Sequence, residues 1–254
     1  MKNEVKKMLL KVTPNSVYEK YKKVKNNRHV TIYKNGSEFH EYNDQYKKVS
    51  VIIPNYNYEK YIEERIDSIL FQTYPIYELI ILDDKSTDNS VAKIEEIIKK
   101  HPEIAIKFVK NEKNSGSVFS QWQKAFTLAT GDYVWIAEAD DSCNSRFLEN
   151  IMRGFEDKDV VLSYAESMRI DEANRIISDD CRDWMLAVSK TKWLHSYIND
   201  GKEEIKEALA VCNTIPNVSA VVFKKGNQVE IIEEAKKFKI SGDWFIYYTL
   251  LSNG

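Results

Sequence analysis

Residues 49–57 read VSVIIPNYN, residues 79–90 read LIILDDKSTDNS, and residues 130–141 read TGDYVWIAEADD. Each stretch is a short run of mostly apolar residues that stops at a cluster of polar ones. A continuous apolar run of this length is typical of a strand that is buried on both faces of a parallel sheet. The three stretches therefore predict three buried strands, each of which ends in a polar loop.

Segments with apolar residues at helical spacing separate these strands. The pattern predicts a helix from Tyr58 to the residues before Pro75, and further helices at 91–98, 118–129 and 147–155. Additional strands are predicted at 106–109 and 160–164. Strands that alternate with helices of this length indicate right-handed crossovers and a mostly parallel sheet. The fold class is therefore α/β, with a central sheet flanked by helices.

The chain divides into three segments by sequence character. Residues 1–47 form a basic N-terminal extension, which we expect to be helical because Val5, Met8, Leu9 and Val12 follow helical spacing. Residues 48–165 carry the regular α/β alternation. Residues 166–254 form a less regular segment.

Within this third segment we expect helices and loops rather than sheet over 176–215. A strand is predicted at 218–223, and the start of a buried helix at 244–251. The chain could end within this segment, so that a longer enzyme would continue beyond it.

Charge and cysteine content exclude several classes of protein. The 37 basic and 39 acidic residues leave no overall positive field for nucleic acid. Nine Lys or Arg residues lie within 1–28, so this segment either faces an anionic membrane surface or forms a solvated helix packed on the body. Three widely spaced cysteines favour neither disulfides nor a zinc site. No apolar run is long enough for a membrane span, and we expect a cytoplasmic protein, at most peripheral at the inner face of the membrane.

The polar clusters after the predicted strands contain the candidate ligand-binding residues. Ligands of an open parallel sheet bind outside the carboxyl ends of its strands, so the residues at 54–57, 83–88 and 138–141 should share one crevice. Each cluster alone could also be a loop that caps a helix. No glycine-rich phosphate loop is present, and carboxylates facing phosphates would repel them. A hard divalent cation, Mg²⁺ or Mn²⁺, between carboxylates and phosphates resolves this conflict.

At these residues the sequence resembles the family-2 glycosyltransferases, which are inverting enzymes with the GT-A fold, a Rossmann-like α/β fold. The resemblance lies in the three stretches quoted above, taken in order, together with NSG at 114–116. It is strong over 49 to about 165, and weaker through NTIPNVSAVVFKK at 213–225 and SGDW at 241–244. It implies that 48–165 bind a nucleotide-sugar and that 166–254 form a smaller acceptor-side region.

The resemblance also implies roles for individual residues on the donor side and at the metal. Tyr56 would stack on the base, Asp84, with Asp83 as the alternative, would hydrogen-bond the base, and Asp141 would bind the metal directly. Asp140 would lie near both the ribose and the metal. The full set on the donor side is Pro54, Tyr56, Asn57, Asp83, Asp84, Asn114, Gly116, Lys124, Asp140 and Asp141. Asp243 matches the catalytic base, although a helix-capping role for it stays open.

Four positions depart from the family pattern. Lys85 stands where Gly is common, Glu138 where Asp is common, and Gly242 where many members have an acid. Trp122 stands where many members carry an Arg near the phosphates. Lys124 is the candidate replacement for that cation, although a Lys on a helix is usually just solvated.

The predicted function is metal-dependent, inverting transfer of a sugar from a UDP- or dTDP-sugar to a glycan or lipid-linked acceptor. The absence of a QxxRW motif argues against a processive polysaccharide synthase, and no D-x-D-x-[TV] motif supports a haloacid-dehalogenase-like phosphatase. The alternative is a non-catalytic module of the same fold that binds a nucleotide-sugar or glycan. Trp184 and Trp193 are candidates for stacking on an acceptor sugar, with core packing as the competing role.

Overall fold

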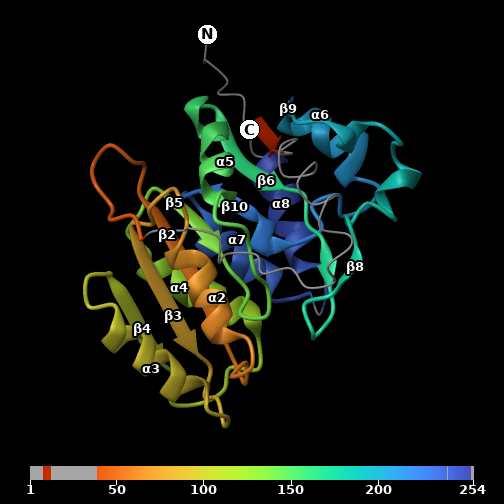
Figure 1. Ribbon diagram of the computed structural model, residues 1–254. Helices are drawn as coiled ribbons and strands as arrows, with labels where there is room; N and C mark the ends of the chain where they lie inside the picture. The colour runs from red at the N-terminus through yellow and green to blue at the C-terminus, as the bar shows by residue number, and fades with distance from the viewer. Residues whose placement is uncertain (1–7, 13–38, 239, 253–254) are drawn as a thin grey trace.

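The computed structural model describes residues 8–12, 39–238 and 240–252. One eight-stranded sheet forms its centre, with the strand order β4-β3-β2-β5-β10-β6-β1-β9 (Figure 1). Its strands are β1 (Met8–Val12), β2 (Val49–Asn55), β3 (Glu78–Asp83), β4 (Ile106–Lys110), β5 (Tyr133–Ile136), β6 (Val160–Ala165), β9 (Tyr197–Asp200) and β10 (Val221–Lys224). A separate hairpin pairs β7 (Arg169–Ile170) with β8 (Ile176–Ser178).

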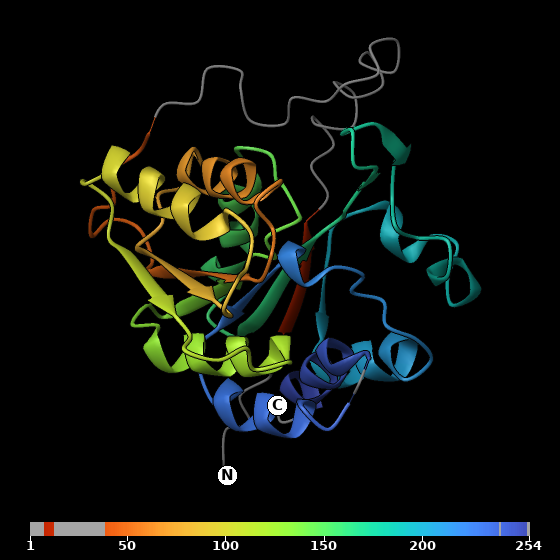
Figure 2. The ribbon, with the colours of Figure 1, turned by 90° about the horizontal axis from the view of Figure 1, so that it is seen from below.

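Helices cover both faces of the sheet, so the molecule has three layers (Figure 2). On one face lie α2 (Ile62–Leu70), α3 (Ser90–Lys100) and α5 (Phe147–Arg153). On the other face lie α4 (Val118–Leu128), α7 (Gln228–Ala235) and α8 (Gly242–Ser252). The shorter α6 (Gly201–Glu204) continues into a π-helical turn, Ile205–Leu209. The predicted α/β class and the flanked, mostly parallel sheet are confirmed.

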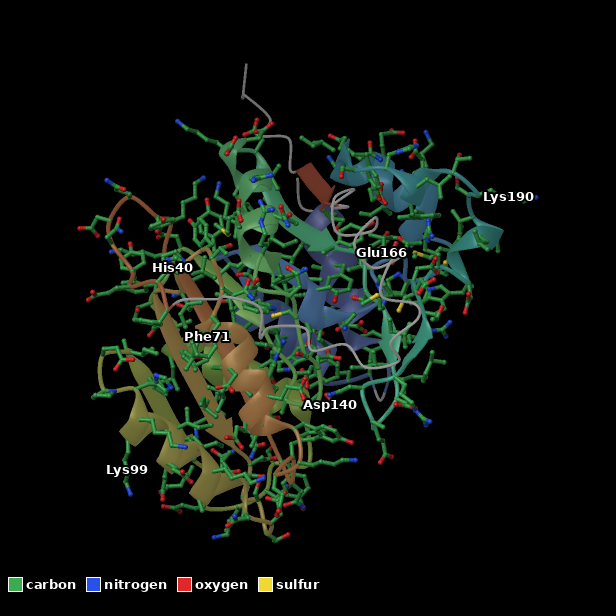
Figure 3. All side chains as sticks on the ribbon, viewed as in Figure 1. His40, Phe71, Lys99, Asp140, Glu166 and Lys190 are labelled. Atoms are coloured by element: carbon green, nitrogen blue, oxygen red, sulfur yellow. The ribbon has the colours of Figure 1, made fainter. Side chains whose placement is uncertain are left out.

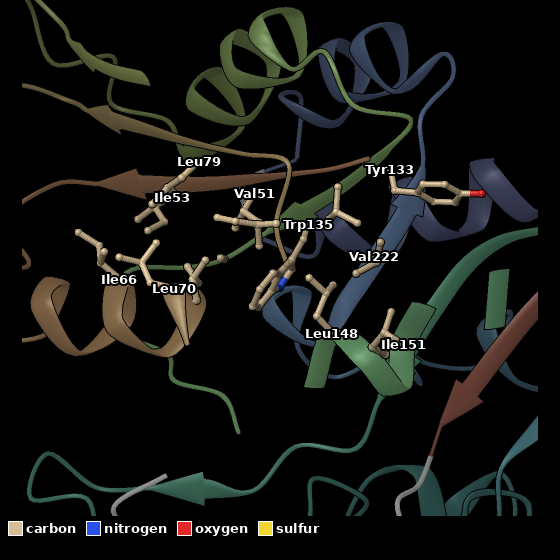
Figure 4. Packing of buried hydrophobic residues seen from close by; sticks show 14 of the residues in the cluster. Val51, Ile53, Ile66, Leu70, Leu79, Tyr133, Trp135, Leu148, Ile151 and Val222 are labelled. Carbon is tan, nitrogen blue, oxygen red and sulfur yellow. The ribbon is translucent and has the colours of Figure 1, made fainter. Parts of the chain in front are cut away.

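The alternating side chains of β2 show how the two cores form. Val49, Val51 and Ile53 enter the core beneath α2, α3 and α5, whereas Ile52 enters the core beneath α4, α7 and α8. Figure 4 shows Trp135 of β5 between the sheet and the side chains of α2 and α5. Because both faces are covered, every residue of β2 and β3 is buried, which accounts for their mostly apolar sequences.

The amino ends of β2, β3 and β5 are joined by a buried polar cluster. Ser50 donates a hydrogen bond to Glu78 Oε1 at 2.6 Å, and the same oxygen accepts from the Thr130 backbone N–H at 2.6 Å. Gly131 N–H donates to Ser50 Oγ at 2.9 Å. A Cβ at Gly131 would lie 2.7 Å from the Lys48 carbonyl oxygen, so only glycine fits here.

Two expectations for the less regular segments are wrong. Met8–Val12 is a strand rather than part of a helix: it pairs parallel with β6 on one side and antiparallel with β9 on the other. Tertiary pairing overrides a short helical pattern, because strand hydrogen bonds on both sides satisfy the backbone. The remaining residues of the predicted helix, 1–7 and 13–38, lie outside the described part of the chain.

The second correction concerns 176–215, where β8 and β9 are strands in a region expected to have none. Both are short and consist of three or four residues, which gives too little alternation for a sequence pattern to show. The predicted strand at 218–223 begins as a 3₁₀ turn, Val218–Ala220, because the Asn217 side chain accepts from Ser219 N–H. The predicted helix at 244–251 is confirmed as α8. The three-segment division stays a prediction, since the sheet takes strands from all three segments.

Candidate active site

The polar loops after β3, β2 and β5 lie at one edge of the sheet. These three strands are neighbours and parallel, and the register places Asn55 opposite Asp83 and Ile52 opposite Ile136. Asp84 N–H also donates to the Asn55 carbonyl at 2.8 Å. The carboxyl ends of all three strands therefore point to the same side, where a ligand of an open sheet binds.

The loops after β2 and β3 are tied together by side chains. Asp83 accepts from Asn55 Nδ2 at 2.8 Å and from Ser86 N–H at 3.0 Å. Asn57 Oδ1 accepts from Thr87 N–H at 2.7 Å. Pro54 is buried beneath this junction. The loop geometry is thus fixed by these side chains without a ligand.

Lys85 occupies a left-handed backbone conformation in the β3 loop, with φ of 67°. A residue with a Cβ pays roughly 1 kcal/mol for this conformation, which glycine adopts freely. This conformation is the physical reason for the glycine that is common at this position of the family pattern.

Asp84 is buried and holds the loop that follows β4. Its carboxylate accepts from Ser115 N–H at 2.9 Å, from Gln121 Nε2 at 2.8 Å and from Asn111 Nδ2 at 2.7 Å. Asn114 Nδ2 donates to the Asp84 carbonyl at 2.9 Å. Asp84 therefore already anchors this loop, and its role in hydrogen-bonding a base stays a prediction.

Gly116, Lys124 and Tyr56 are three further predicted donor residues. Gly116 adopts a left-handed φ of 67°, and its N–H donates to Asn114 Oδ1 at 2.7 Å. Lys124 donates to Asn111 Oδ1 at 2.6 Å, and Asn111 in turn donates to Asp84. Tyr56 is 46% exposed, which leaves its ring free to stack on a planar ligand.

The loop after β5 carries the predicted metal-binding residues. Asp140 and Asp141 line a pocket together with Tyr61 and Glu64 of α2 and residues of the β7–β8 hairpin; Figure 3 marks the position of Asp140. Burial, and then the charge of Asp141, raise the pKa of Asp140. Burial, and then the charge of Asp140, raise the pKa of Tyr58, so this tyrosine after β2 lies close to the loop after β5.

These two carboxylates fit a divalent cation that completes its shell elsewhere. Among the described residues, no group of three His, Cys, Asp or Glu side chains is arranged to hold a metal by itself. Mg²⁺ and Mn²⁺ suit oxygen ligands, and Mg²⁺ is usually held by one or two carboxylates while substrate phosphates and water supply the remaining ligands. The mutual repulsion that raises the pKa of Asp140 is what a cation between the two would relieve.

Two of the departures from the family pattern contact each other. Trp122 Nε1 on α4 donates to Glu138 Oε1 at 2.9 Å. Burial raises the pKa of Glu138 to about 8, against the opposing effect of this hydrogen bond, and the charges of Asp140 and Asp141 raise it further. Trp122 and Glu138 thus form a pair. The neutral indole of Trp122 stands where many members of the family carry an Arg, and the carboxyl that it contacts favours its protonated form.

Arg65 supplies positive charge beneath the acidic loop. It is fully buried on α2, with its guanidinium 5.1 Å from the centre of the Trp135 ring. Within the described residues its nitrogens have no nitrogen or oxygen hydrogen-bond partner. Its charge opposes the burial that raises the pKa of Glu138 and of Asp140. A buried arginine is costly unless its charge is compensated, and of these two carboxyls the ionised form of Asp140 provides that compensation.

Asp243, the predicted base, lies in the first turn of α8. Asn213 Nδ2 donates to its Oδ2 at 3.0 Å. Burial raises the pKa of Asp243, whereas hydrogen bonds from Trp244 N–H and Asn213 lower it. The charges of Asp243 and Glu138 both contribute, after burial, to raising the pKa of Tyr247, so both carboxyls lie near this buried tyrosine.

Gly242, the residue before the base, packs directly on α4. A Cβ at this position would lie 2.3 Å from Cζ of Phe119. The close approach of α8 to Phe119 is therefore the reason for glycine where many members of the family have an acid.

The sequence model of Glycosyl transferase family 2 matches residues 50–206. The chain belongs to this family. An uncharacterized glycosyltransferase of Nostoc sp. is 37% identical over 114 residues, which are 45% of this chain and 34% of that protein. The poly(ribitol-phosphate) beta-N-acetylglucosaminyltransferase TarP of Staphylococcus aureus is 36% identical over 107 residues, which are 41% of this chain and 32% of TarP. The chain thus spans about a third of the length of these two family-2 relatives.

Solved structures show the same fold. The structure of residues 1–349 of S. aureus TarS in complex with UDP superposes with a TM-score of 0.54 at 21% identity, and covers 81% of this chain and 55% of that one. This likeness confirms the predicted GT-A fold for this family-2 chain. No helix in the described part of the chain is both long enough and apolar enough to cross a membrane.

Sequence reasoning missed three residues of the site. Tyr58 stands directly beside the quoted PNYN run, and Asn213 begins the NTIPN motif, so both were within reach. Arg65 carried a signal too: it is a charge on the apolar face of a helix, between Ile62 and Ile66. Of the two candidate tryptophans, Trp193 is 2% exposed and belongs to the core, whereas Trp184 is 42% exposed.

Proposed function

We propose that this chain transfers a sugar, with inversion, from a nucleotide-diphosphate sugar of the UDP or dTDP type to a hydroxyl of a glycan or lipid-linked acceptor. The observation that carries the proposal is the meeting of three polar strand ends at one sheet edge, where Asp140 and Asp141 line a pocket. The names of the family-2 relatives agree with a transferase. TarP acts on poly(ribitol-phosphate), as its name says, which favours a cell-surface glycan as acceptor.

In this proposal the base and the leaving group have separate machinery. Asp243 accepts the proton of the acceptor hydroxyl. At the same time the hydroxyl oxygen of the acceptor attacks the anomeric carbon from the face opposite the diphosphate. Asp140 and Asp141 would hold Mn²⁺ or Mg²⁺, which would stabilise the negative charge of the departing diphosphate. Tyr56 stacks on the nucleobase of the donor, and Asp83 or Asp84 hydrogen-bonds that nucleobase. One carboxylate acting as base is enough, unlike the two that glycoside hydrolysis needs.

Asp243→Asn tests the catalytic part of the proposal. The exchange keeps the side-chain shape but removes the base, so turnover of UDP- or dTDP-sugars should fall by a factor of about 10² to 10⁴. Donor binding should persist, measured as the rise in melting temperature that the nucleotide-sugar causes in the presence of Mn²⁺. Asp132→Asn, an exposed carboxylate next to β5, is the matched control and should behave like the unmodified chain.

Asp141→Asn tests the metal-binding part. Loss of this carboxylate should abolish the Mn²⁺-dependent share of the donor-induced shift, whereas binding of a nucleoside without phosphates should stay unchanged. A chain that binds nucleotide-sugars but never turns them over, with water or any acceptor, would instead be a non-catalytic binding module.

The place of action is part of the same proposal. A cytoplasmic protein, held at the inner face of the membrane by the basic residues of 1–28, would meet both nucleotide-sugars and lipid-linked acceptors. Co-sedimentation with vesicles that contain phosphatidylglycerol, compared with phosphatidylcholine vesicles at the same salt concentration, tests this. Equal binding to both, or to neither, would rule it out.

A further inference from the structure

Trp184 presents an aromatic ring whose polar atom is already engaged. Its side chain is 42% exposed, and its indole N–H donates to the Asn213 carbonyl at 2.9 Å. An exposed indole on a loop would ordinarily turn freely. This hydrogen bond fixes the edge of the ring to the protein and leaves apolar ring surface facing solvent.

The residue that fixes Trp184 also holds the proposed base. Asn213 Nδ2 donates to Asp243 Oδ2 at 3.0 Å, and Asn213 Oδ1 accepts from Ile215 N–H at 3.2 Å. The carbonyl, the Nδ2 and the Oδ1 of Asn213 are thus engaged by Trp184, Asp243 and Ile215, respectively. A single residue therefore separates the exposed ring from Asp243.

The segment around Asn213 is held from a second side as well. Trp244, next to the base on α8, donates its indole N–H to the Leu209 carbonyl at 2.8 Å. Leu209 ends the π-helical turn, a form that often occurs at functional sites. Two tryptophans thus clamp the stretch from Leu209 to Asn213 between the exposed ring and α8.

A fixed, exposed ring beside a base is suited to one class of ligand. Pyranose rings have an apolar face of C–H groups that packs on an aromatic face, while their hydroxyls stay at the rim. An acyclic polyol phosphate has no such face, and the engaged N–H offers it no donor. We propose that Trp184 is the platform on which a pyranose ring of the acceptor stacks, so that an acceptor hydroxyl reaches Asp243. This inference rests on the proposed transferase function.

Binding can be measured before any acceptor is identified. The full chain would be labelled with 5-fluorotryptophan, and the ¹⁹F resonance of Trp184 assigned from its disappearance in Trp184→Phe. Methyl β-D-glucopyranoside and methyl N-acetyl-β-D-glucosaminide, each added with UDP and Mn²⁺, should shift this resonance, whereas ribitol 5-phosphate should not. The buried Trp193 gives an internal control and should not move. A Trp184 resonance that responds to neither pyranoside overturns the proposal.

Kinetic variants separate the ring from its hydrogen bond. With the pyranoside that binds best as acceptor, Trp184→Ala should raise the acceptor KM about tenfold, the scale of one lost aromatic contact. Trp184→Phe keeps a ring and should raise it by less than about threefold. Leu186→Ala removes a side chain that is 51% exposed two residues away, and should leave the acceptor KM unchanged. An unchanged acceptor KM in Trp184→Ala would refute the platform.

Donor hydrolysis distinguishes failure of this inference from failure of the function. Water needs no platform, so release of UDP from a UDP-sugar without acceptor should be equal in Trp184→Ala and the unmodified chain. Normal hydrolysis with an unchanged acceptor KM refutes only the platform. Absence of both hydrolysis and transfer to any acceptor in the unmodified chain refutes the transferase proposal itself, and the fluorine experiment then still decides whether Trp184 binds a pyranose.

Discussion

The two halves of the molecule use polar residues in different ways. In the half that contains β2 to β5, buried side chains such as Asp83 and Asp84 cross-link loops and leave little freedom at the strand ends. In the half that follows β6, strands are short, and large apolar side chains such as Trp184 and Leu186 stay exposed. The difference teaches that the loops of the first half, which would bind the nucleotide in the proposed function, are ordered by their own side chains, whereas the second half, which would bind the acceptor, depends on a few anchoring contacts around Asp243.

If this contrast is right, the greatest loss of stability should come from the amino ends of the strands in the first half. In Gly131→Ala the new Cβ would meet the Lys48 carbonyl at 2.7 Å and Ser50 Oγ at 2.8 Å, which are fixed by the sheet. We expect the free energy of unfolding to fall by about 3 kcal/mol. The measurement is urea denaturation. Gly226→Ala, whose Cβ would meet its nearest atom at 3.7 Å, is the control and should change little.

Glu138 tests whether the junction between the halves carries a protonated carboxyl. Burial raises its pKa in the folded state from the model-compound value of 4.5 to about 8. The folded state therefore binds the proton more tightly than the unfolded state does, and stability should fall as pH rises between these two values. In Glu138→Gln this loss, on the order of 2 kcal/mol for a partly buried group, should disappear. The free energy of unfolding of both proteins is measured at pH 5 and pH 9 without metal. An equal change between the two pH values in both proteins would contradict this prediction.

Much of the first half could be predicted from sequence because burial on both faces of a sheet forces long apolar runs. The strands from Val49 to Tyr164 were placed within a residue or two, and the loops that carry Asp83 and Asp140 follow from strand order alone. β1 and β9 could not be predicted, because their pairing depends on distant partners. β1 pairs with β6, more than 150 residues along the chain, and with β9, more than 180 residues along it. The hydrogen bond from Asn213 to Asp243 was equally inaccessible, because no periodicity encodes a contact between a loop and the first turn of a helix 30 residues further along the chain.

Asn213 sharpens the contrast from the acceptor side. Asn213→Ala removes a donor that lowers the pKa of Asp243, so that pKa should rise further above its usual value. Since the base acts in its ionised form, the acid limb of the profile of kcat/KM against pH should move to higher pH, with a rate loss of about tenfold near neutrality. The free energy of unfolding should change by less than about 1 kcal/mol, since the contact is partly exposed. A lower rate with an unmoved acid limb would indicate a merely structural role.

Lys85 should give the smallest effect, and in the opposite direction. Lys85→Gly relieves a left-handed backbone conformation on an exposed loop, which should raise the free energy of unfolding by roughly 0.5 to 1 kcal/mol. Thermal denaturation with and without a UDP-sugar would show whether donor affinity is retained. A loss of stability would mean that the entropy of the unfolded glycine outweighs the relieved strain.

The position of β1 has a consequence for synthesis of the protein. Residues 8–12 leave the ribosome well before their two partner strands, which end at residues 165 and 200. The first strand must therefore wait, unpaired, until at least 165 residues have been made, and contacts so distant in the chain slow folding. Affinity tags fused ahead of residue 8 would be carried through this last docking step, so the yield of folded protein should depend more on a tag there than on the same tag at the other end.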